Sequence, residues 1–382
     1  MSDIQPAAKK IACFISSLSA GGAERVCAIL ANHWVSQGWV VTIITLADPS
    51  TDFYLLDPAV RRRVVPGGEQ QVGVGSSVVV NLRRVIGLRR VLQEAEANFA
   101  ISFMDSNNVL LALASLGAQH TIPIGTEHIY PPQVSLGLAW STLRRLTYGR
   151  LWAVIALTHE SSTWLSQHTR AARVPVIPNP VPWPLSRGAH GSLPPAKGRG
   201  RLLCVGRLTH QKGFDLLLPC FARLAAEFDG WDLVILGEGP ERFSLQRSIE
   251  ELALDGRVHL PGLVGNIGDW YATADIFVMP SRFEGFPMTL VEAMACGVAA
   301  VCFDCMTGPR TIIRDGVDGI LVPVGDTSRL QRELAALMSD RGRRAEMGRH
   351  ATEVRSRFSI ESVGRMWNAL FDEALVSARN SV

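Results

Sequence analysis

Short apolar runs rich in β-branched residues alternate with segments of helical periodicity along nearly the whole chain. Most of these runs are continuously apolar, which is typical of strands in a parallel sheet covered by helices on both faces. The predicted strands lie at residues 11–16, 40–46, 99–103, 121–125, 153–157 and 174–177, and then at 201–205, 232–236, 258–260, 276–279 and 299–303. Strand and helix alternate in both halves, so the pattern predicts two doubly wound, Rossmann-like α/β domains.

A stretch rich in proline and glycine separates the two halves. Prolines occupy positions 178, 180, 182 and 184, and further glycines and prolines follow up to residue 200, which is typical of a linker. We therefore predict an N-terminal domain over residues 1–184, a linker over 185–198, a C-terminal domain over 199–358 and a long amphipathic helix within 359–382. Two such domains leave a cleft between them, and ligands bind at the carboxyl ends of the strands.

Composition excludes several classes of protein. The hydrophobic fraction, 47%, is too high and the net charge, +3, too small for a disordered chain. No apolar run approaches the ~18 residues of a membrane-spanning helix. The run after Lys9 and Lys10 is so short that a buried strand is a better interpretation than a signal peptide. Seven cysteines, mostly in apolar stretches, favour a reduced, cytoplasmic chain, and the isolated Cys302–Cys305 pair does not predict zinc.

The positive charge is concentrated in the N-terminal half. Residues 1–180 carry 15 Lys and Arg against 11 Asp and Glu, whereas the remainder carries 23 against 24. This asymmetry predicts an anionic partner for the N-terminal half, such as a phosphate-bearing substrate or a lipid surface. No nucleic-acid partner is expected.

The segment richest in candidate site residues follows the predicted strand at 276–279. A loop with Glu284 leads into a helix that we expect to begin at Pro287 and to end at Gly297, with Glu292 about a turn and a half inside it. The free N–H groups of residues 287–289 would form an anion site suited to a phosphate. The two carboxylates can hold hydroxyls of a sugar-containing ligand. The alternative is a helix start with two surface acids.

A second loop follows the predicted strand at 201–205. Gly206, Arg207, Lys212 and Gly213 place two cations and two glycines at one strand end, where they would neutralise a diphosphate. The order of residues is not that of a P-loop, and an ordinary solvated loop remains the alternative.

Further candidates follow the strands of the N-terminal half. Gly21 and Gly22 would let backbone N–H groups approach a ligand closely, but no G-x-G-x-x-G fingerprint supports a nicotinamide enzyme. His128, after the strand at 121–125, has a carboxylate beside it and is either a site residue or a structural histidine. Asp105 and Asn179 either line the cleft or cap turns. No D-x-D pair or H-E-x-x-H motif predicts a metal site.

Together these motifs resemble the family 4 retaining glycosyltransferases of the two-domain GT-B class. The resemblance rests on Glu284 and Glu292 as an E-x7-E motif, on Gly206-Arg207 with Gln211-Lys212-Gly213, on Gly21-Gly22, and on Gly316-Val317-Asp318-Gly319. It covers nearly the whole chain. It implies a C-terminal helix that crosses back to an N-terminal acceptor-binding domain, and a C-terminal domain that binds a nucleotide sugar.

The resemblance also implies roles for individual residues. Arg207 and Lys212 hold the donor diphosphate, Glu292 the ribose, and Glu284 the transferred sugar. Gly22 lets its loop close on the diphosphate, and His128 lies beside the sugar, so His128, Glu284, Arg207 and Lys212 are the catalytic candidates. The donor-binding set is Gly21, Gly22, Gly206, Arg207, Lys212, Glu284, Gly285, Phe286, Pro287, Met288, Thr289 and Glu292. Many relatives carry Glu where this chain has Thr311, which affects sugar or acceptor contacts.

Residues 82–92 look like the helix that lipid-linked enzymes of this kind use against acceptor diphosphates, because they hold four arginines and no acid. Arg83 and Arg90 share one helical face. The acceptor candidates are Arg83, Arg84, Arg90, Asp105 and Arg144. A solvated helix is the alternative. A neighbouring segment with Trp140, Arg144, Arg145 and Tyr148 could anchor a peripheral protein at a membrane interface.

The resemblance implies a metal-independent, retaining transferase without a cofactor. Its donor would be a UDP-sugar, carrying a hexose or N-acetylhexosamine, and its acceptor a polyprenyl-diphosphate-linked oligosaccharide of bacterial surface polysaccharide or glycan assembly. The enzyme would be cytoplasmic and peripheral to the inner face of the membrane. A GDP-mannose-dependent α-mannosyltransferase is the alternative donor choice. An oxidoreductase or epimerase, and a non-catalytic nucleotide- or lipid-binding protein on the same fold, are the other classes.

Overall fold

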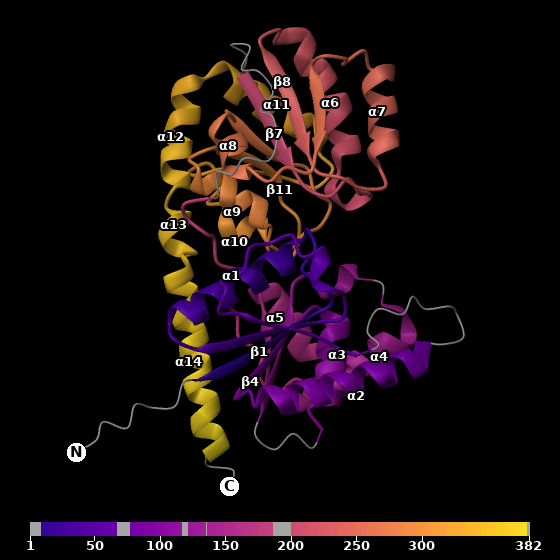
Figure 1. The fold of residues 1–382 in the computed structure, drawn as a ribbon. Coiled ribbons are helices and arrows are strands. Elements are labelled where there is room, and N and C mark those ends of the chain that lie inside the picture. The colour runs from indigo at the N-terminus through magenta and orange to yellow at the C-terminus, as the bar shows by residue number, and fades with distance from the viewer. Residues whose placement is uncertain (1–8, 67–76, 117–120, 135, 186–199, 380–382) are drawn as a thin grey trace, which may run out of the picture. The chain divides into compact units, whose positions relative to one another are not determined.

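The computed structural model describes residues 9–66, 77–116, 121–134, 136–185 and 200–379. The chain forms two compact units (Figure 1). Unit 1 comprises Met1–Pro180 with Ile360–Val382, and unit 2 comprises Val181–Ser359. Apart from Leu185, the predicted linker at 185–198 lies outside the described residues.

Unit 1 contains a parallel sheet that has six strands among the described residues, in the order β3-β2-β1-β4-β5-β6. The strands are β1 (Lys10–Ile15), β2 (Val40–Thr45), β3 (Arg61–Val64), β4 (Phe99–Phe103), β5 (Ile122–Glu127) and β6 (Ala153–Ala156). The helices are α1 (Gly22–Ser36), α2 (Ser77–Ala95), α3 (Asp105–Ala114), α4 (Gly137–Thr147), α5 (His159–His168) and α14 (Ile360–Arg379), with short 3-10 turns at Pro49–Thr51, Pro131–Gln133 and Tyr148–Arg150.

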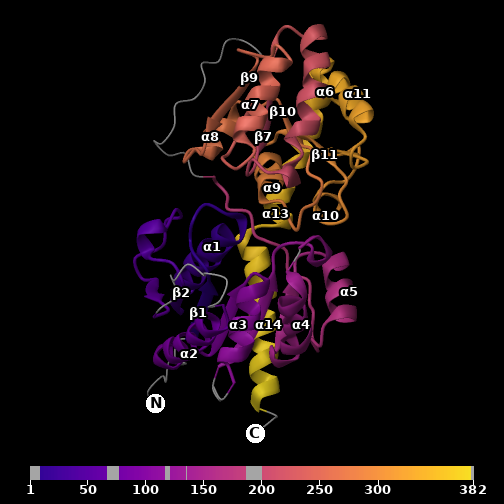
Figure 2. The same ribbon diagram turned by 90° about the vertical axis from the view of Figure 1, so that its right-hand side faces the viewer.

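Both faces of this sheet are covered, as its continuously apolar strands predict. Ala12 and Phe14 of β1 pack in one core cluster with Leu88 of α2 and Val109 of α3. Successive side chains of a strand point to opposite faces, and on the other face Phe99 of β4 contacts Phe371 of α14, with ring centroids 4.4 Å apart. In Figure 2 α3 lies between α2 and α4, and it contacts both.

One predicted strand in this half is wrong, and one further strand is not among those predicted. The run at 174–177 forms no strand and makes only an isolated bridge between Val176 and Ala156. Conversely β3 is absent from the predicted strands and lies at the edge of the sheet. Its side chains alternate in exposure, and Arg62 on the inner side pairs with Asp52 at 2.9 Å. An edge strand needs no continuous apolar run, which is why the pattern missed it.

The final amphipathic helix is confirmed as α14, which packs against α1 within unit 1 (Figure 1). Trp34 of α1 lies with its ring centroid 5.8 Å from Trp367 and 5.7 Å from Phe371. Gly364 permits this approach, since a Cβ there would lie 2.4 Å from Nε2 of His33. Aromatic packing therefore attaches α14 to the helices and strands of the N-terminal half of the chain.

Unit 2 repeats the architecture, with six strands among the described residues in the order β12-β11-β10-β7-β8-β9. The strands are β7 (Gly200–Val205), β8 (Trp231–Leu236), β9 (Val258–Gly262), β10 (Ile276–Met279), β11 (Ala299–Phe303) and β12 (Ile320–Val322). The helices are α6 (Phe214–Glu227), α7 (Arg242–Glu251), α8 (Ile267–Ala272), α9 (Met288–Ala295), α10 (Pro309–Ile312), α11 (Thr327–Ser339), α12 (Arg341–Ala351) and α13 (Val354–Arg357), with the 3-10 turn η4 (His210–Lys212). The pattern predicted these strands except β12, which is too short to stand out.

Each sheet has one pair of neighbouring strands from which the chain winds outward in opposite directions. These pairs are β1 with β4 in unit 1 and β7 with β10 in unit 2. Ligands of open α/β sheets bind outside the carboxyl ends of the strands at such a switch point. The loops after β7 and β10 are those that carry Arg207, Lys212 and Glu284. No helix among the described residues is both long and apolar enough to cross a bilayer.

Candidate functional site

The loops after β7 and β10 lock together in unit 2. Gly213, which follows η4, has a φ of +68°, and a Cβ there would lie 2.0 Å from the carbonyl oxygen of Pro280. Only glycine allows both this backbone conformation and this approach. The side-chain amide of Gln211 donates to the carbonyl of Phe283 at 2.9 Å. The two loops are thus held at a fixed spacing.

This spacing brings Lys212 and Glu284 into an ion pair. Nζ of Lys212 lies 2.6 Å from Oε1 of Glu284, and the two side chains are only 17% and 7% exposed. The stem of Lys212 passes over Gly206, where a Cβ would lie 3.1 Å from its Cδ and Cε. The sequence placed these residues in one site, and the structure brings them together.

Arg282 and Asp215 form a second connection between the same loops. The guanidinium of Arg282 donates to both carboxylate oxygens of Asp215, at 2.8 and 2.7 Å, and to the carbonyl of His210 at 2.6 Å. The hydrogen bond from Arg282 lowers the pKa of Asp215. Sequence reasoning missed this pair, although both residues flank the two motifs.

Glu284 is also held from its other side. The hydroxyl of Thr307 donates a hydrogen bond to the carbonyl oxygen of Glu284. Gly308, with a φ of +91°, packs so closely that a Cβ would lie 2.6 Å from Cδ of Pro287. Thr307 is a further residue that the sequence did not single out.

Helix α9 begins at Met288, one residue later than predicted, so Pro287 is its N-cap and not its first helical residue. Proline has no backbone N–H, so Met288 and Thr289, and not Pro287, supply the free donors expected at residues 287–289. Gly297 ends the helix with a φ of +78°, as predicted.

The two carboxylates of the E-x7-E motif are not surface acids. Glu284 is 6% exposed and Glu292 is fully buried, with the hydroxyl of Tyr271 3.2 Å from its Oε2. The neighbouring Gly285 and Phe286 are buried as well. Burying two carboxylates is costly unless each has partners, and this contradicts the alternative of a plain helix start. Apart from its aromatic character, nothing in the sequence marks Tyr271 as a partner of Glu292.

Arg207 contrasts with Lys212. It is exposed and makes no ion pair with any residue that the structure describes. An exposed guanidinium on the same loop as the largely buried ammonium of Lys212, with the start of α9 following the neighbouring strand β10, is an arrangement that can bind an oxyanion.

In unit 1 the Gly21–Gly22 segment leads from β1 into α1. The hydroxyl of Tyr54 donates to the carbonyl of Gly21 at 2.8 Å and lies 3.2 Å from its N–H. Gly22 is the first residue of α1, and a Cβ there would have open space around it. Gly22 is therefore not required by packing in this structure.

His128 is placed just after β5. Its Nε2 lies 2.9 Å from the hydroxyl of Thr126, its ring stacks on Phe103, and it lines a small pocket with Asn179. Burial lowers the pKa of His128 to about 4, so the imidazole is neutral at pH 7.

Glu127 is the last residue of β5, not a residue after the strand as predicted. It is buried, and the hydroxyl of Tyr148 donates to it at 2.5 Å while Asn108 donates to Tyr148. Burial, with a smaller contribution from Asp105, raises the pKa of Glu127 to about 7. The carboxylate beside His128 thus belongs to a buried polar cluster.

The arginines expected to contact an acceptor separate into two groups. Arg83 and Arg90 are exposed on one face of α2, as their spacing predicts, and Arg84 is half-buried. Arg144 is buried with its guanidinium 4.8 Å from the ring of Trp164, and Asp105 is buried at the start of α3.

The predicted interfacial anchor, which spans α4 and the 3-10 turn after it, is therefore wrong for two of its residues, Arg144 and Tyr148, both of which are buried. Trp140 packs partly against the core. The residues that α4 exposes include Leu138, Leu143, Arg145 and Leu146.

Two family models divide the chain between them. Residues 20–182 match the model described as Glycosyltransferase Family 4, and residues 189–354 match the model described as Glycosyl transferases group 1. The chain belongs to the family 4 glycosyltransferases. The match of two models, one for each α/β half, agrees with the two-sheet architecture.

Curated relatives differ in how much of their length this glycosyltransferase spans. An exopolysaccharide phosphotransferase of Streptomyces coelicolor is 32% identical over 77% of this chain, but the chain spans only 30% of that protein. The GalNAc-alpha-(1->4)-GalNAc-alpha-(1->3)-diNAcBac-PP-undecaprenol alpha-1,4-N-acetyl-D-galactosaminyltransferase of Campylobacter jejuni is 26% identical over 95% of this chain and 98% of its own length.

Solved structures share the fold. HepE of Anabaena in complex with UDP superposes with a TM-score of 0.79 at 20% identity, covering 95% of this chain and 100% of that one. Sucrose-phosphate synthase of Thermosynechococcus elongatus gives a TM-score of 0.78 at 18% identity over 97% and 100%. These similarities establish the GT-B fold of this glycosyltransferase.

Within the described residues, no cluster of three or more His, Cys, Asp or Glu side chains is arranged to hold a metal ion. The seven cysteines are free thiols, and Cys302 and Cys305 are both buried. Burial raises the pKa of Cys305 to about 12, which leaves its thiol protonated.

Proposed function

We propose that this glycosyltransferase moves a hexose or N-acetylhexosamine from a UDP-sugar to a polyprenyl-diphosphate-linked oligosaccharide, with retention of the anomeric configuration. The observation that carries the donor part is the Lys212–Glu284 pair, 2.6 Å apart at the switch point of unit 2, on a loop that also carries the exposed Arg207. This arrangement offers cations for a diphosphate on the loop after β7 and a carboxylate for sugar hydroxyls on the loop after β10, with Lys212 and Glu284 in direct contact.

Each donor group has a proposed partner. Arg207, Lys212 and the N–H groups at the start of α9 would bind the diphosphate, Glu284 the transferred sugar, and Glu292 the ribose. The segment Gly285, Phe286, Pro287, Met288 and Thr289 would shape the site around Gly206. Because Glu292 is fully buried beside Tyr271, this role requires the ribose to reach a carboxylate beneath the surface.

The proposed chemistry follows from the leaving group. As the bond from C1 of the sugar to the diphosphate breaks, negative charge grows on the phosphate, and Arg207, Lys212 and the helix start stabilise it. If the acceptor hydroxyl attacks from the departing face, configuration is retained and the phosphate takes the proton. Glu284, paired with Lys212, suits sugar binding better than nucleophilic attack. With this supply of positive charge we propose metal-independent transfer without a cofactor.

Unit 1 is proposed to receive the acceptor. Its net positive charge, the arginines Arg83 and Arg90 exposed on α2, and the undecaprenol-linked substrates named for two Campylobacter jejuni relatives support this choice. We retain Arg84, Asp105 and Arg144 as weaker acceptor candidates. His128 and the Gly21–Gly22 segment are proposed to take part in transfer on the family resemblance alone.

We also propose peripheral binding to the inner face of the cytoplasmic membrane. Helix α2 exposes Leu82 and Ile86 beside Arg83 and Arg90, and α4 exposes Leu138 at 90%. Apolar side chains interspersed with arginines suit an anionic bilayer interface.

A GDP-mannose donor is the second candidate. A lipopolysaccharide core mannosyltransferase of Rhizobium meliloti is 31% identical over 45% of this chain. UDP is favoured because HepE, which has the same fold, binds UDP and UDP-glucose. A non-catalytic nucleotide- or lipid-binding protein remains the alternative of another class.

Thermal unfolding with UDP, GDP and NAD tests the proposal. A ligand at about 100 times its dissociation constant stabilises the folded state by roughly 2.7 kcal/mol. We expect stabilisation by UDP that Lys212→Ala abolishes and that Arg247→Ala, an exposed arginine of α7, leaves intact. Stabilisation by GDP alone would shift the donor to mannose, and a response to NAD alone would overturn the proposal. UDP binding without transfer to any lipid-linked acceptor pool would favour the non-catalytic alternative.

A further inference from the structure

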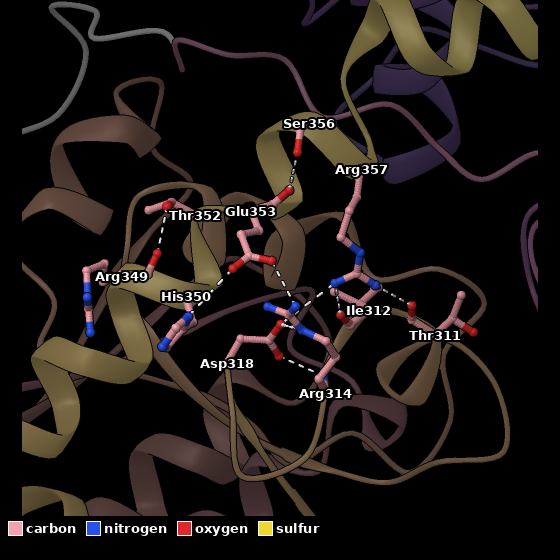
Figure 3. Close-up of polar contacts among 10 residues, drawn as sticks. All are labelled: Thr311, Ile312, Arg314, Asp318, Arg349, His350, Thr352, Glu353, Ser356 and Arg357. Atoms are coloured by element: carbon pink, nitrogen blue, oxygen red, sulfur yellow. Dashed lines mark hydrogen bonds and ion pairs between the residues drawn. The ribbon is translucent and has the colours of Figure 1, made fainter.

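The segment Gly316-Val317-Asp318-Gly319 contains a fully buried carboxylate that the donor site does not use. Asp318 accepts two hydrogen bonds of 2.6 Å from Arg314, one from its backbone N–H and one from Nε (Figure 3). Nη1 of Arg357 lies 3.8 Å from the same carboxylate. Since a buried charge is stable only with such partners, Asp318 fixes the positions of two arginines.

Arg357 in turn holds the end of the short helix α10. Its Nη1 donates to the carbonyl of Ile312 at 2.8 Å and its Nη2 to the carbonyl of Thr311 at 3.1 Å (Figure 3). The last carbonyls of a helix lack partners within the helix. The planar guanidinium supplies two donors in fixed directions, which an ammonium cannot do.

The opposite end of α10 contacts the donor-site loop. Thr307 donates to the carbonyl of Glu284, and a Cβ on Gly308 would lie 2.9 Å from the carbonyl of Gly285. Helix α10 has only four residues, so it has little internal freedom to absorb a displacement. A continuous path of contacts therefore joins Arg357 to Glu284.

The remaining contacts of the cluster lead elsewhere. Arg314 also pairs with Glu353 at 2.8 Å, and Glu353 lies 3.6 Å from His350 of α12 (Figure 3). These ion pairs fasten the turn to α12 and α13 and reach no donor-site residue. Substitutions in the cluster could therefore lower the stability of the fold through these ion pairs, and the test of a positioning role must separate that effect from an effect on donor binding.

We infer that Arg357, braced by Asp318, is a positioning residue for the donor sugar, because it fixes α10 and thereby the backbone of Glu284. The inference rests on the proposed function, in which Glu284 contacts the sugar and Arg207 with Lys212 contact the diphosphate. Loosening α10 should therefore weaken binding of the sugar part of the donor and spare the UDP part.

The test compares Arg357→Lys and Thr307→Val with the wild-type protein. The lysine keeps the charge beside Asp318 but loses the two-pronged contact, and valine removes the hydroxyl at the other end of α10 at similar size. Dissociation constants are measured by calorimetry for UDP, UDP-glucose and UDP-N-acetylgalactosamine. We expect both variants to bind UDP within about twofold of wild type and to bind the preferred UDP-sugar about tenfold more weakly.

Arg349→Ala is the matched control. Arg349 lies on α12 (Figure 3) and is exposed, and its Nη2 lies 3.7 Å from the carboxylate of Glu346 in the same helix. It should leave every dissociation constant unchanged.

Wild-type affinity for the UDP-sugar in both variants, or equal losses for UDP and UDP-sugar, would overturn the positioning role. If Arg357→Lys does not fold, Thr307→Val alone decides between these outcomes. A wild-type protein that binds no nucleotide at all would instead refute the proposed function, so the two failures are distinguishable. If the wild-type protein prefers guanine, GDP and GDP-mannose replace the uridine pair.

Discussion

The ammonium of Lys212 lies 2.6 Å from the carboxylate of Glu284, although the two residues are 72 positions apart in the chain. Each side chain is largely buried, so each provides the main charge compensation for the other. Removing one partner from a buried pair leaves the other charge uncompensated and typically costs ~3–5 kcal/mol. Lys212 keeps some solvent access, which places the expected cost at the lower end of that range.

Substitutions of Lys212 and of Glu284 should affect different properties, UDP binding in the first case and turnover in the second. Lys212→Met removes the cation proposed for the diphosphate, so we expect loss of UDP binding together with destabilisation by about 3 kcal/mol. Glu284→Gln keeps a hydrogen-bond acceptor for Lys212, so UDP binding should persist while kcat falls at least about tenfold. Calorimetry with UDP and initial rates with the UDP-sugar measure both. Equal UDP affinities for wild type and Lys212→Met would contradict the assignment.

The strands and the two donor loops could be predicted because their signals are local. Apolar runs give β7 and β10, and glycines 206, 213 and 297 mark the loops and the helix end. The ion pair itself could be anticipated only as a shared site, since its geometry depends on Gly213 approaching Pro280 across two strands. The burial of Arg144 against Trp164 could not be predicted, because a basic residue on an amphipathic helix gives the same pattern whether it faces solvent or core. The contact from Thr307 to Glu284 depends on tertiary packing in the same way.

Arg282 should act on donor affinity without touching the donor. It joins the two donor loops by bidentate contact with Asp215 and by donating to the carbonyl of His210. Arg282→Lys keeps the charge but cannot make all three bonds, so we expect the KM for the UDP-sugar to rise about three- to tenfold. The corresponding Arg247→Lys change, in an exposed pair on α7, should have no effect on steady-state kinetics. An unchanged KM in Arg282→Lys would show that the loops hold their spacing without this residue.

Helix α2 should carry the electrostatic part of membrane binding. Arg83 and Arg90 are exposed on the same face as Leu82 and Ile86. Each arginine near an anionic surface contributes about 1 kcal/mol, so Arg83→Glu with Arg90→Glu should weaken binding to phosphatidylglycerol-containing vesicles more than tenfold. Flotation with phosphatidylcholine vesicles and at high salt provides the comparison, since charge attraction is screened by salt. The variant should still unfold at the wild-type temperature, and equal flotation of variant and wild type would assign any binding to another surface.

The buried carboxyl of Glu127 should make stability fall as pH rises. Burial raises its pKa to about 7 from an ordinary value of 4.5, so folding favours the protonated form. Stability from this group is complete below about pH 4.5 and is lost as pH rises through 7, by up to about 3 kcal/mol. Glu127→Gln stays uncharged and can still accept from Tyr148, so it should lose less stability than wild type between pH 5 and pH 8.

His128 should have the opposite pH dependence, because burial lowers its pKa to about 4 and its contribution to stability is lost as pH falls from 6.5 through 4. Chemical unfolding of wild type, Glu127→Gln and His128→Gln at pH 4.5, 6 and 8 separates the two groups. Parallel pH profiles for wild type and Glu127→Gln would mean that the carboxyl is ionised in the folded protein, with Arg144 compensating its charge.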